Sequence, residues 1–346
     1  MSEQSGLKMK VEHAFVAVSF PGDTGYDFHL AEIAYQSLTE STLNDYDFVF
    51  APYQKGHAPT VLFKYTASHR NAEFSFTPGE IGVHNSEGKH SYLESVSNLI
   101  SKLKTTELQK VIYSRTKRVE TESLDVFHLY KSLVSKYIEA CVFLINIPGI
   151  GCWCGATPEI LITQEGKNYK TTALAGTQKL VGTVDDVVWD KKEIDEQRFI
   201  QTFIKENLET LKINFEVSDS RTVKAGAVCH IKTDFTLLNP HSIINVVNSL
   251  HPGPAISGYP KQKAIQTIAA FENYDRKYYT GFFGSLAKGK LQLYINLRSM
   301  EIFKNCCLLY LGGGITKDSS PVKEWEETEL KSTTLGSLLS TGIVQN

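Results

Sequence analysis

The stretch DKKEIDEQRFIQTFIKENLETL, residues 190–211, predicts a long amphipathic helix that carries two carboxylates on its apolar face. Because each residue turns an α-helix by about 100°, side chains can be compared by their angle around its axis. Glu196 lies about 60° from Glu193 and shares its face. The apolar residues within about 20° of Glu193 are Ile200, Ile204 and Leu211. Both carboxylates therefore point toward the side on which the helix should be buried.

A second stretch, SSPVKEWEETELK at residues 319–331, repeats this pattern. Lys331 and Leu335 fall within about 20° of Glu324, and Glu327 falls within about 60°. Unpaired buried charge is costly, so these four carboxylates should meet a cation or exchange protons. A bound metal ion and partly buried salt bridges near the helix ends both explain the pattern.

Two further glutamate pairs with the same spacing serve as an internal control. Glu206 and Glu209 on the first helix, and Glu326 and Glu329 on the second, project about 140–200° from the apolar stripe. We expect these pairs to be solvated. For the four inward carboxylates, Mg²⁺ is the natural metal, because hard cations take oxygen ligands. A di-iron carboxylate site would need Glu-x-x-His repeats, which the sequence lacks.

The composition is typical of a soluble chain, with 346 residues, 42% hydrophobic, 21% charged and a net charge of −2. No long basic run favours nucleic acid or an anionic membrane as a partner. No apolar run could span a bilayer, and residues 1–10 lack the apolar core of a signal peptide, so we expect a cytoplasmic protein. The six cysteines include no C-x-x-C pair, which favours small core residues over zinc ligands or disulfides.

Hydrophobic periodicity predicts a mixture of hairpins and long helices. The predicted helices cover 92–103, 125–138, 190–211 and 262–271, with a fifth that begins at Pro321 and is capped by Ser320. The predicted strands cover 12–20, 46–53, 60–65, 110–114, 140–147, 151–156, 160–164, 169–175, 215–217, 221–223, 228–233, 282–287, 291–299 and 306–311. Regular strand–helix alternation is absent, which favours an α+β fold over a doubly wound sheet. No linker divides the chain, so we expect a single domain over 1–346.

Four further features could take part in chemistry. Arg298 near a strand end could bind a carboxylate or phosphate, or form a structural salt bridge. The run Gly312–Gly314 predicts a flexible turn whose backbone N–H groups could approach an anion. Lys110 opens a strand; most such lysines are solvated, but one shielded from water can serve as a general base. Glu159 follows Pro158, where a surface carboxylate is the commoner outcome.

Nine blocks, in order along the chain, resemble the chorismate-utilising enzymes, which include isochorismate, salicylate, anthranilate and aminodeoxychorismate synthases. The blocks are KVIYSR (110–115), GATPEIL (155–161), ALAGT (173–177), DKKEIDEQ (190–197), CHIKTDF (229–235), LHPGPAISGYP (250–260), YYTGFFG (278–284), INLRS (295–299) and GGGITKDSSPVKEWEETELK (312–331). The resemblance implies a β-sandwich of mostly antiparallel sheets wrapped by helices. The matching catalytic part covers 106–340, and the N-terminal part over 1–105 is more variable.

The resemblance also implies an Mg²⁺ ion beside the ring carboxylate of a chorismate substrate. Glu196 and Glu327 would be its direct ligands, while Glu193 and Glu324 would act mainly through water. The residues that the resemblance implies for substrate binding are Arg298 and Tyr279 at the enolpyruvyl carboxylate, His230 and His251 along the site, and the backbone of Ala175, Gly176, Thr177, Gly312, Gly313, Gly314 and Lys331.

Within this family, two positions resemble the isochorismate synthases. Lys110 stands where members that add water carry a lysine, and Ala175 stands where aminodeoxychorismate synthases carry a nucleophilic lysine. In the implied reaction, Lys110 activates water for attack at C2 of the ring. Glu159 protonates the departing C4 hydroxyl from the other face. Because water is the nucleophile, no glutamine amidotransferase subunit is expected. The pathway would be menaquinone or siderophore biosynthesis.

Two alternatives remain open. A salicylate synthase would form isochorismate and then eliminate pyruvate, and a ligand-binding paralogue would lack an acid, a base or a metal ligand. None of those groups is lost here. The positions that depart from the family pattern are Gln197, Gly253, Lys277 and Tyr113. Of these, Gln197 and Tyr113 are expected to affect local packing and the rate of the reaction.

Overall fold

The computed structural model describes residues 9–54, 56, 58–82, 86–225 and 228–339. Its helices are α1 (Thr42–Asp45), α2 (Lys89–Thr105), α3 (Val126–Lys136), α4 (Lys191–Thr210), α5 (Ile243–Leu250), α6 (Lys261–Phe271) and α7 (Pro321–Leu339), with a 3₁₀ turn at Val184–Asp186. Its strands are β1 (Met9–Lys10), β2 (Phe15–Ser19), β3 (Asp27–Tyr35), β4 (Phe48–Ala51), β5 (Val61–Arg70), β6 (Phe74–Ser75), β7 (Lys110–Glu120), β8 (Cys141–Ile147), β9 (Gly151–Thr157), β10 (Ile160–Glu165), β11 (Asn168–Lys179), β12 (Phe215–Val217), β13 (Arg221–Ala225), β14 (Val228–Leu237), β15 (Gly258–Tyr259), β16 (Phe282–Ser285), β17 (Gln292–Ile295), β18 (Ser299–Ile302) and β19 (Cys306–Thr316).

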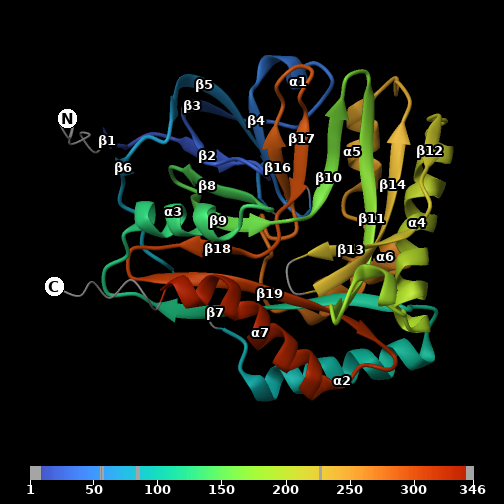
Figure 1. The fold of residues 1–346 in the computed structure, drawn as a ribbon. Coiled ribbons are helices and arrows are strands. Elements are labelled where there is room, and N and C mark those ends of the chain that lie inside the picture. The colour runs from blue at the N-terminus through green and yellow to red at the C-terminus, as the bar shows by residue number, and fades with distance from the viewer. Residues whose placement is uncertain (1–8, 55, 57, 83–85, 226–227, 340–346) are drawn as a thin grey trace.

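Seventeen of these strands form one sheet that folds back on itself (Figure 1). One half runs in the order β3-β2-β8-β9-β18-β19-β7, and the other in the order β5-β4-β16-β17-β10-β11-β14. The pairing of β3 with β5 joins the two halves. Every pairing inside this sheet is antiparallel, and only the small β1–β6 pair is parallel among the described strands.

The halves pack face to face because successive side chains of a strand point to opposite sides. In β2, Val16 and Val18 join an aromatic-rich core that also receives Phe48 and Phe50 from β4 in the other half. The alternate residues Phe15 and Ala17 point outward into a second core. Strands buried on both faces read as continuous apolar runs, as β2 and β4 do.

Helices cover the outer face of each half-sheet. Residues of α3 and α7 complete the core outside β2, β8 and β19. Residues of α4 and α5 complete the core outside β11, β14 and β17. A fourth cluster joins α2 and α6 to β7. The predicted α+β architecture, a sandwich of mostly antiparallel sheets wrapped by helices, is confirmed by these layers.

The five predicted helices are confirmed as α2, α3, α4, α6 and α7, with ends that shift by a few residues. Asp125 caps α3 by accepting a hydrogen bond from the backbone N–H of His128 (3.0 Å). Several elements were missed, of which α5 and β3 are the longest. The apolar residues of α5 follow helical spacing, but the helix is only eight residues long. The strand β3 lacks clear alternation because it carries polar residues on both faces.

Two local predictions were wrong. The run 291–299 is not one strand, because β17 ends at Ile295 and β18 begins at Ser299. Arg298, with a φ of +48°, turns the chain between them. Gly312–Gly314 is not a flexible turn but lies inside β19, fully paired with β7. The prediction for the six cysteines is confirmed, since all are buried and free.

Candidate functional site

The glycine run of β19 forms the centre of the candidate site. A Cβ atom on Gly312 would lie 2.9 Å from the hydroxyl oxygen of Tyr279, and one on Gly314 would lie 2.8 Å from Cε of Lys110. Real Cβ atoms essentially never approach other heavy atoms so closely. Glycine therefore lets this strand pass directly beside two of the predicted site residues.

Lys110, the predicted general base, begins β7 and is only 7% exposed. It is thus not one of the solvated strand-end lysines. Its ammonium forms an ion pair with Glu196 of α4, which joins the two halves of the fold at the site. Although burial opposes ionisation of Glu196, the Lys110 ammonium holds the pKa of that carboxyl below its ordinary value.

Glu159, the predicted general acid, follows β9 and is held through its backbone. Its carbonyl accepts a hydrogen bond from Ile295 (2.9 Å), and its N–H donates to the hydroxyl of Thr157 (3.2 Å). Burial raises the pKa of Glu159 to about 7, while the nearby cations of Arg298 and Lys110 act in the opposite direction. A carboxyl group with a pKa near neutrality can be protonated and still give up its proton readily.

Arg298 presents its side chain to solvent beside Glu159. Its carbonyl accepts a hydrogen bond from Ala156 (3.2 Å), which fixes the turn that carries it. None of the described carboxylates forms an ion pair with its guanidinium. The structure therefore does not show the structural salt bridge that was the alternative, and a free planar guanidinium suits a carboxylate ligand.

The four predicted metal ligands lie at the starts of α4 and α7. A Cβ atom on Gly313 would lie 3.3 Å from Oε2 of Glu324 and 3.8 Å from Oε1 of Glu327, so the glycine run also faces α7. The Oε2 atoms of Glu193 and Glu324 are buried and accept no hydrogen bond from any described residue. The other oxygen of Glu324 accepts one from the hydroxyl of Ser319 (2.7 Å).

This donor set fits a hard divalent cation. All the candidate ligand atoms are carboxylate oxygens, and two buried ones have no protein partner, which would be costly without a cation. Burial and the neighbouring Glu327 raise the pKa of Glu324, against the Ser319 hydrogen bond. Across the described residues, no three His, Cys, Asp or Glu side chains are grouped so that they could hold a metal alone. A cation here would therefore need oxygens from water or from a substrate.

Two lysines surround these carboxylates. Lys331 forms an ion pair with Glu327 (2.7 Å) and donates a hydrogen bond to the carbonyl of Gly312 (2.8 Å). Lys192, which was not among the predicted site residues, is exposed on α4. Its charge adds to the lowering of the pKa of Glu196 by Lys110. At Glu324 the same charge only partly offsets the rise in pKa that burial causes. The position of Lys192 directly before Glu193 was the available signal.

The remaining predicted residues fall into two groups. Ala175 and Gly176 lie on β11 against α4, and Nδ1 of His230 donates a hydrogen bond to the carbonyl of Gly176 (2.8 Å). Thr177 belongs to the same strand, but its side chain lies outside the described part of the structure. The hydrogen bond of His251 does not connect it to these residues. Its Nε2 donates to the carbonyl of Thr280 (2.9 Å), and it lines a separate cavity.

A family sequence model described as "Chorismate binding enzyme" matches residues 57–340, which is most of the chain. The chain belongs to the chorismate-binding enzymes. The nine sequence blocks predicted this family, and the match confirms it.

Several isochorismate synthases are similar to this chorismate-binding enzyme. "Isochorismate synthase EntC" of Escherichia coli is 27% identical over 246 residues, which cover 67% of this chain and 62% of that protein. The chain thus aligns with less than two thirds of that relative's length. "Vibriobactin-specific isochorismate synthase" of Vibrio cholerae is 25% identical over 100% of this chain and 91% of that protein.

The solved structure of MenF, the menaquinone-specific isochorismate synthase from Escherichia coli, has the same fold. It superposes with a TM-score of 0.80 at 19% identity and covers 97% of this chain and 90% of that chain. Anthranilate synthase component I from Streptococcus pneumoniae superposes with a TM-score of 0.70 at 15% identity. At these identities the likeness shows the fold alone. Separately, no helix among the described residues is long and apolar enough to cross a membrane.

A buried ion pair, absent from the sequence predictions, ties several segments of the site together in this chorismate-binding enzyme. Arg276 and Glu272 are both almost completely buried and pair through two hydrogen bonds of 2.6 and 2.7 Å. Arg276 also donates to the carbonyls of Ile112 (2.7 Å) and Ile256 (2.9 Å). Glu272 accepts from the backbone N–H of Ser114 (2.8 Å). We name this Glu272–Arg276 pair, with those contacts, the clamp.

The clamp holds β7 in register beside the glycine run. Because Ser114 pairs with Gly312 across β7 and β19, a shift of Ser114 would also shift the strand that faces Tyr279. Tyr279 is held from the other side, since its N–H donates to the carbonyl of Arg276 (2.8 Å). No sequence signal pointed to this pair, because Glu272 and Arg276 follow the end of α6 and the i,i+4 rule applies within a helix.

Both departures singled out for packing find partners. The Gln197 amide donates to the carbonyl of Ala173 and to the hydroxyl of Thr233, each at 3.0 Å. The hydroxyl of Tyr113 donates to buried Glu87 (2.8 Å). None of these hydrogen bonds is to the predicted catalytic residues Lys110 and Glu159.

The control pairs require one correction. Glu329 is not simply solvated, because its carboxylate forms ion pairs with Arg115 and with Lys117 (2.6 Å). Arg115 is buried and also lies over the ring of Trp325 (3.9 Å). The helix α7 therefore has a second buried flank, which packs against β7 and which a single apolar stripe did not reveal.

Proposed function

We propose that this chain is an Mg²⁺-dependent isochorismate synthase, which converts chorismate to isochorismate by adding water at C2 and losing the C4 hydroxyl. One observation carries the proposal most directly. The buried amine of Lys110 and the carboxyl of Glu159, whose pKa is about 7, act on each other electrostatically within one site. This is the base and acid pair that water addition with loss of a hydroxyl requires.

Lys110 would take a proton from the attacking water. Its burial supports this role, because the side chain lies inside the site and not in bulk solvent. The ion pair with Glu196 fixes the direction in which the amine points. When Glu196 instead binds a metal cation, Lys110 would lose this partner. Its ammonium would then give a proton to solvent, and the neutral amine would accept one from the attacking water.

Glu159 would give its proton to the departing C4 hydroxyl. At neutral pH a group with a pKa of about 7 is protonated in about half of the molecules. The proton balance then closes, since Lys110 gains one proton from the incoming water and Glu159 loses one to the outgoing water. Proton exchange with solvent restores both groups.

The substrate's two carboxylates need separate anchors. Arg298 and Tyr279 would hold the enolpyruvyl carboxylate, and the free guanidinium of Arg298 supports this assignment. The residues proposed to complete the anion pocket are Ala175, Gly176, Thr177, His230, Gly312, Gly313, Gly314 and Lys331. His251 would contribute indirectly, because its hydrogen bond to the carbonyl of Thr280 would help to position the neighbouring Tyr279.

Bound Mg²⁺ would hold and polarise the ring carboxylate of the substrate. Glu196 and Glu327 would be its direct ligands, while Glu193 and Glu324 would act mainly through water. The two unpartnered carboxylate oxygens, on Glu193 and Glu324, support a cation at this place. Water as the nucleophile removes the need for a glutamine amidotransferase subunit.

We further propose that residues 1–346 act as one domain. In support, β2 pairs with β8 and β4 pairs with β16, so the N-terminal strands complete both half-sheets. The names of similar proteins include menaquinone-specific and vibriobactin-specific enzymes, which supports menaquinone or siderophore biosynthesis as the pathway.

The direct test incubates the purified chain with chorismate, with and without Mg²⁺, and separates the products by chromatography. We expect isochorismate to accumulate only with Mg²⁺ and no pyruvate to appear. Pyruvate and salicylate formed in step with chorismate loss would instead identify a salicylate synthase. Tight binding of chorismate without any turnover would identify a ligand-binding paralogue.

A further inference from the structure

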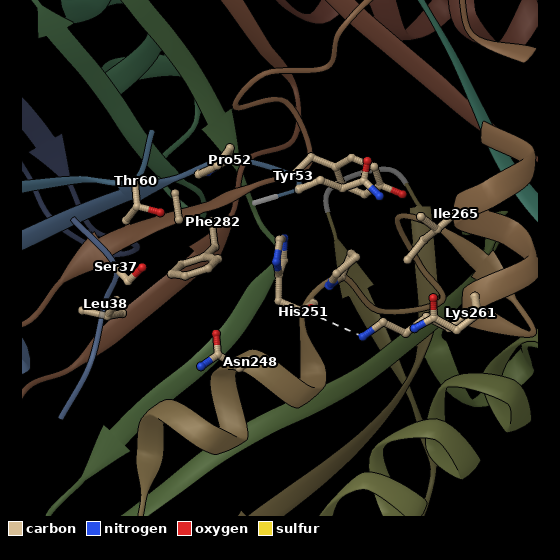
Figure 2. A pocket seen from close by; sticks show the side chains of 14 residues that line it. Ser37, Leu38, Pro52, Tyr53, Thr60, Asn248, His251, Lys261, Ile265 and Phe282 are labelled. Carbon is tan, nitrogen blue, oxygen red and sulfur yellow. Dashed lines mark hydrogen bonds between the residues drawn. The ribbon is translucent and has the colours of Figure 1, made fainter. Parts of the chain in front are cut away.

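A cavity of about 390 Å³ lies between the end of β4, the end of α5 and the start of α6 (Figure 2). Its volume falls within the roughly 300–1,000 Å³ typical of small-molecule sites. Of all the predicted site residues, only His251 lines it. The cavity is therefore separate from the group that contains Lys110, Glu159 and Arg298.

Lys261 supplies the one charged side chain of the cavity wall. It is partly buried, and its ammonium donates two long hydrogen bonds, to the carbonyls of Ser249 (3.3 Å) and His251 (3.5 Å). It also lies 5.4 Å from the ring centre of Phe203. Figure 2 shows this ammonium pointing toward His251. Burial lowers the pKa of Lys261.

Lys261 differs from three other partly buried lysines of the fold. Lys110, Lys117 and Lys277 each form an ion pair with a carboxylate. Within the described residues, no carboxylate forms an ion pair with Lys261. A partly desolvated cation without an anion is costly, and an anionic ligand would remove that cost.

The remaining wall suits an organic anion better than a bare inorganic one. It contains no acidic residue among those described, and it combines apolar surface with neutral hydrogen-bonding groups. The apolar part includes the rings of Phe282 and His251, whose centroids are 5.0 Å apart. The neutral polar side chains that line it are Ser37, Gln54, Thr60, Asn248 and Gln262.

We propose that this cavity is a second ligand site, which binds a small carboxylate with an apolar, ring-sized body through the Lys261 ammonium. The single positive charge selects a monoanion, and the apolar wall around Phe282 receives the ring. This site does not depend on the reaction proposed above, because none of its other wall residues takes part in that reaction.

An occupant of the cavity would touch two groups that hold the candidate site in place. His251 donates to the carbonyl of Thr280, next to Tyr279. Tyr53 also lines the cavity. The guanidinium carbon of Arg276 lies 4.6 Å from the centre of the Tyr53 ring, so Tyr53 contacts the clamp. Ligand binding here would therefore bear on the position of Tyr279.

The test titrates 4-fluorobenzoate into the full chain and follows binding by ¹⁹F NMR. Arg298→Gln serves as the background, because it weakens anion binding at the candidate active site. We expect this variant to bind with a Kd on the order of 1 mM. Adding Lys261→Gln should weaken binding at least about tenfold, because it removes the charge-assisted contact. Adding Lys263→Gln is the matched control, since Lys263 lies on the same helix but is exposed and pairs with Glu107. It should change nothing.

Ile265→Trp provides a second test should Lys261→Gln disturb folding, because it fills the cavity and keeps the lysine. It should also abolish binding. The proposal is overturned if Arg298→Gln shows no binding, or if Lys261→Gln and Lys263→Gln behave alike. It is equally overturned if inorganic phosphate displaces the probe from Lys261 as strongly as benzoate does, because the site would then not select an apolar body.

Discussion

The helices α4 and α7 carry the same Glu-x-x-Glu pattern, but the glutamates have different surroundings in the two helices. In each helix the first glutamate has a buried Oε2 that accepts no hydrogen bond within the described part of the chain, on Glu193 in α4 and on Glu324 in α7. In each helix the second glutamate forms an ion pair with a lysine. Up to this point the two helices are equivalent.

The lysines make the difference. Glu196 of α4 pairs with Lys110, which is buried and comes from a distant strand. Glu327 of α7 pairs with Lys331, four residues along the same helix, and both side chains are nearly half exposed. The spacing of glutamates thus sets the face on which they lie, whereas in the proposed mechanism the partner decides whether that face takes part in proton transfer. The predictions below test this asymmetry.

The largest expected difference concerns turnover. Lys110→Ala should lower the rate of chorismate conversion by about 10²–10⁴-fold, because it removes the proposed general base. Lys331→Ala should lower the rate less than about tenfold, because its ammonium is exposed and screened by water. Both rates can be measured by chromatography of the products at saturating Mg²⁺. Equal losses in the two variants would contradict the asymmetry.

The next prediction concerns the protonation of Glu159. Its pKa is raised to about 7 by burial and held down by Arg298 and Lys110, so its protonated fraction falls as pH rises through 7. Wild-type turnover should therefore decline above about pH 7. Lys110→Ala removes a cation, so the pKa of Glu159 should rise further, by up to about one unit, or ~1.4 kcal/mol.

Carbon-13 NMR of the labelled glutamate carboxyls can follow this titration, with Glu159→Gln used to assign the signal. In Lys331→Ala the Glu159 titration should stay where it is in the wild type. A shift of the same size in both lysine variants would show that the two helices are electrostatically equivalent at the acid.

The sequence revealed the glutamate faces but not their partners. Helical phase correctly turned Glu193 and Glu324 inward, because angle around a helix is a local property. The Lys110–Glu196 pair joins residues 86 positions apart, and no local pattern encodes such a contact. The same reason hid the contacts of the clamp, and it hid the second buried flank of α7 that holds Glu329.

Backbone geometry was the other source of error. Three consecutive glycines favour a turn when only local freedom is considered. In β19 they instead continue a strand, and glycine is favoured because a Cβ atom would crowd Tyr279 at Gly312 and Lys110 at Gly314. The positive φ of Arg298 was equally unreadable, since the residues around it have ordinary strand composition.

A third prediction compares stability without metal. Glu196→Gln leaves the buried ammonium of Lys110 without its counterion, and should cost about 1–2 kcal/mol of unfolding free energy, less than a fully buried pair because Glu196 is partly exposed. Glu327→Gln should cost less than about 0.5 kcal/mol, the usual worth of an exposed i,i+4 pair. Urea unfolding in EDTA measures both. A loss at Glu327 as large as that at Glu196 would refute the assigned difference in burial.

The smallest effect, and the one with a change of sign, is expected at Glu324. Without metal, its Oε2 is buried and unpartnered, and a buried unpaired charge costs more than a buried unpaired amide. Glu324→Gln should therefore raise the stability of the metal-free protein, by less than about 1 kcal/mol. With Mg²⁺ the order should reverse, because binding to the folded state stabilises the wild type and the variant has lost one acidic group from the proposed site. Glu326→Gln, on the exposed side of the same helix, is the matched control and should show neither effect. If Mg²⁺ raised the melting temperature of Glu324→Gln as much as that of the wild type, α7 would not belong to the metal site, and the resemblance between the two helices would end at their spacing.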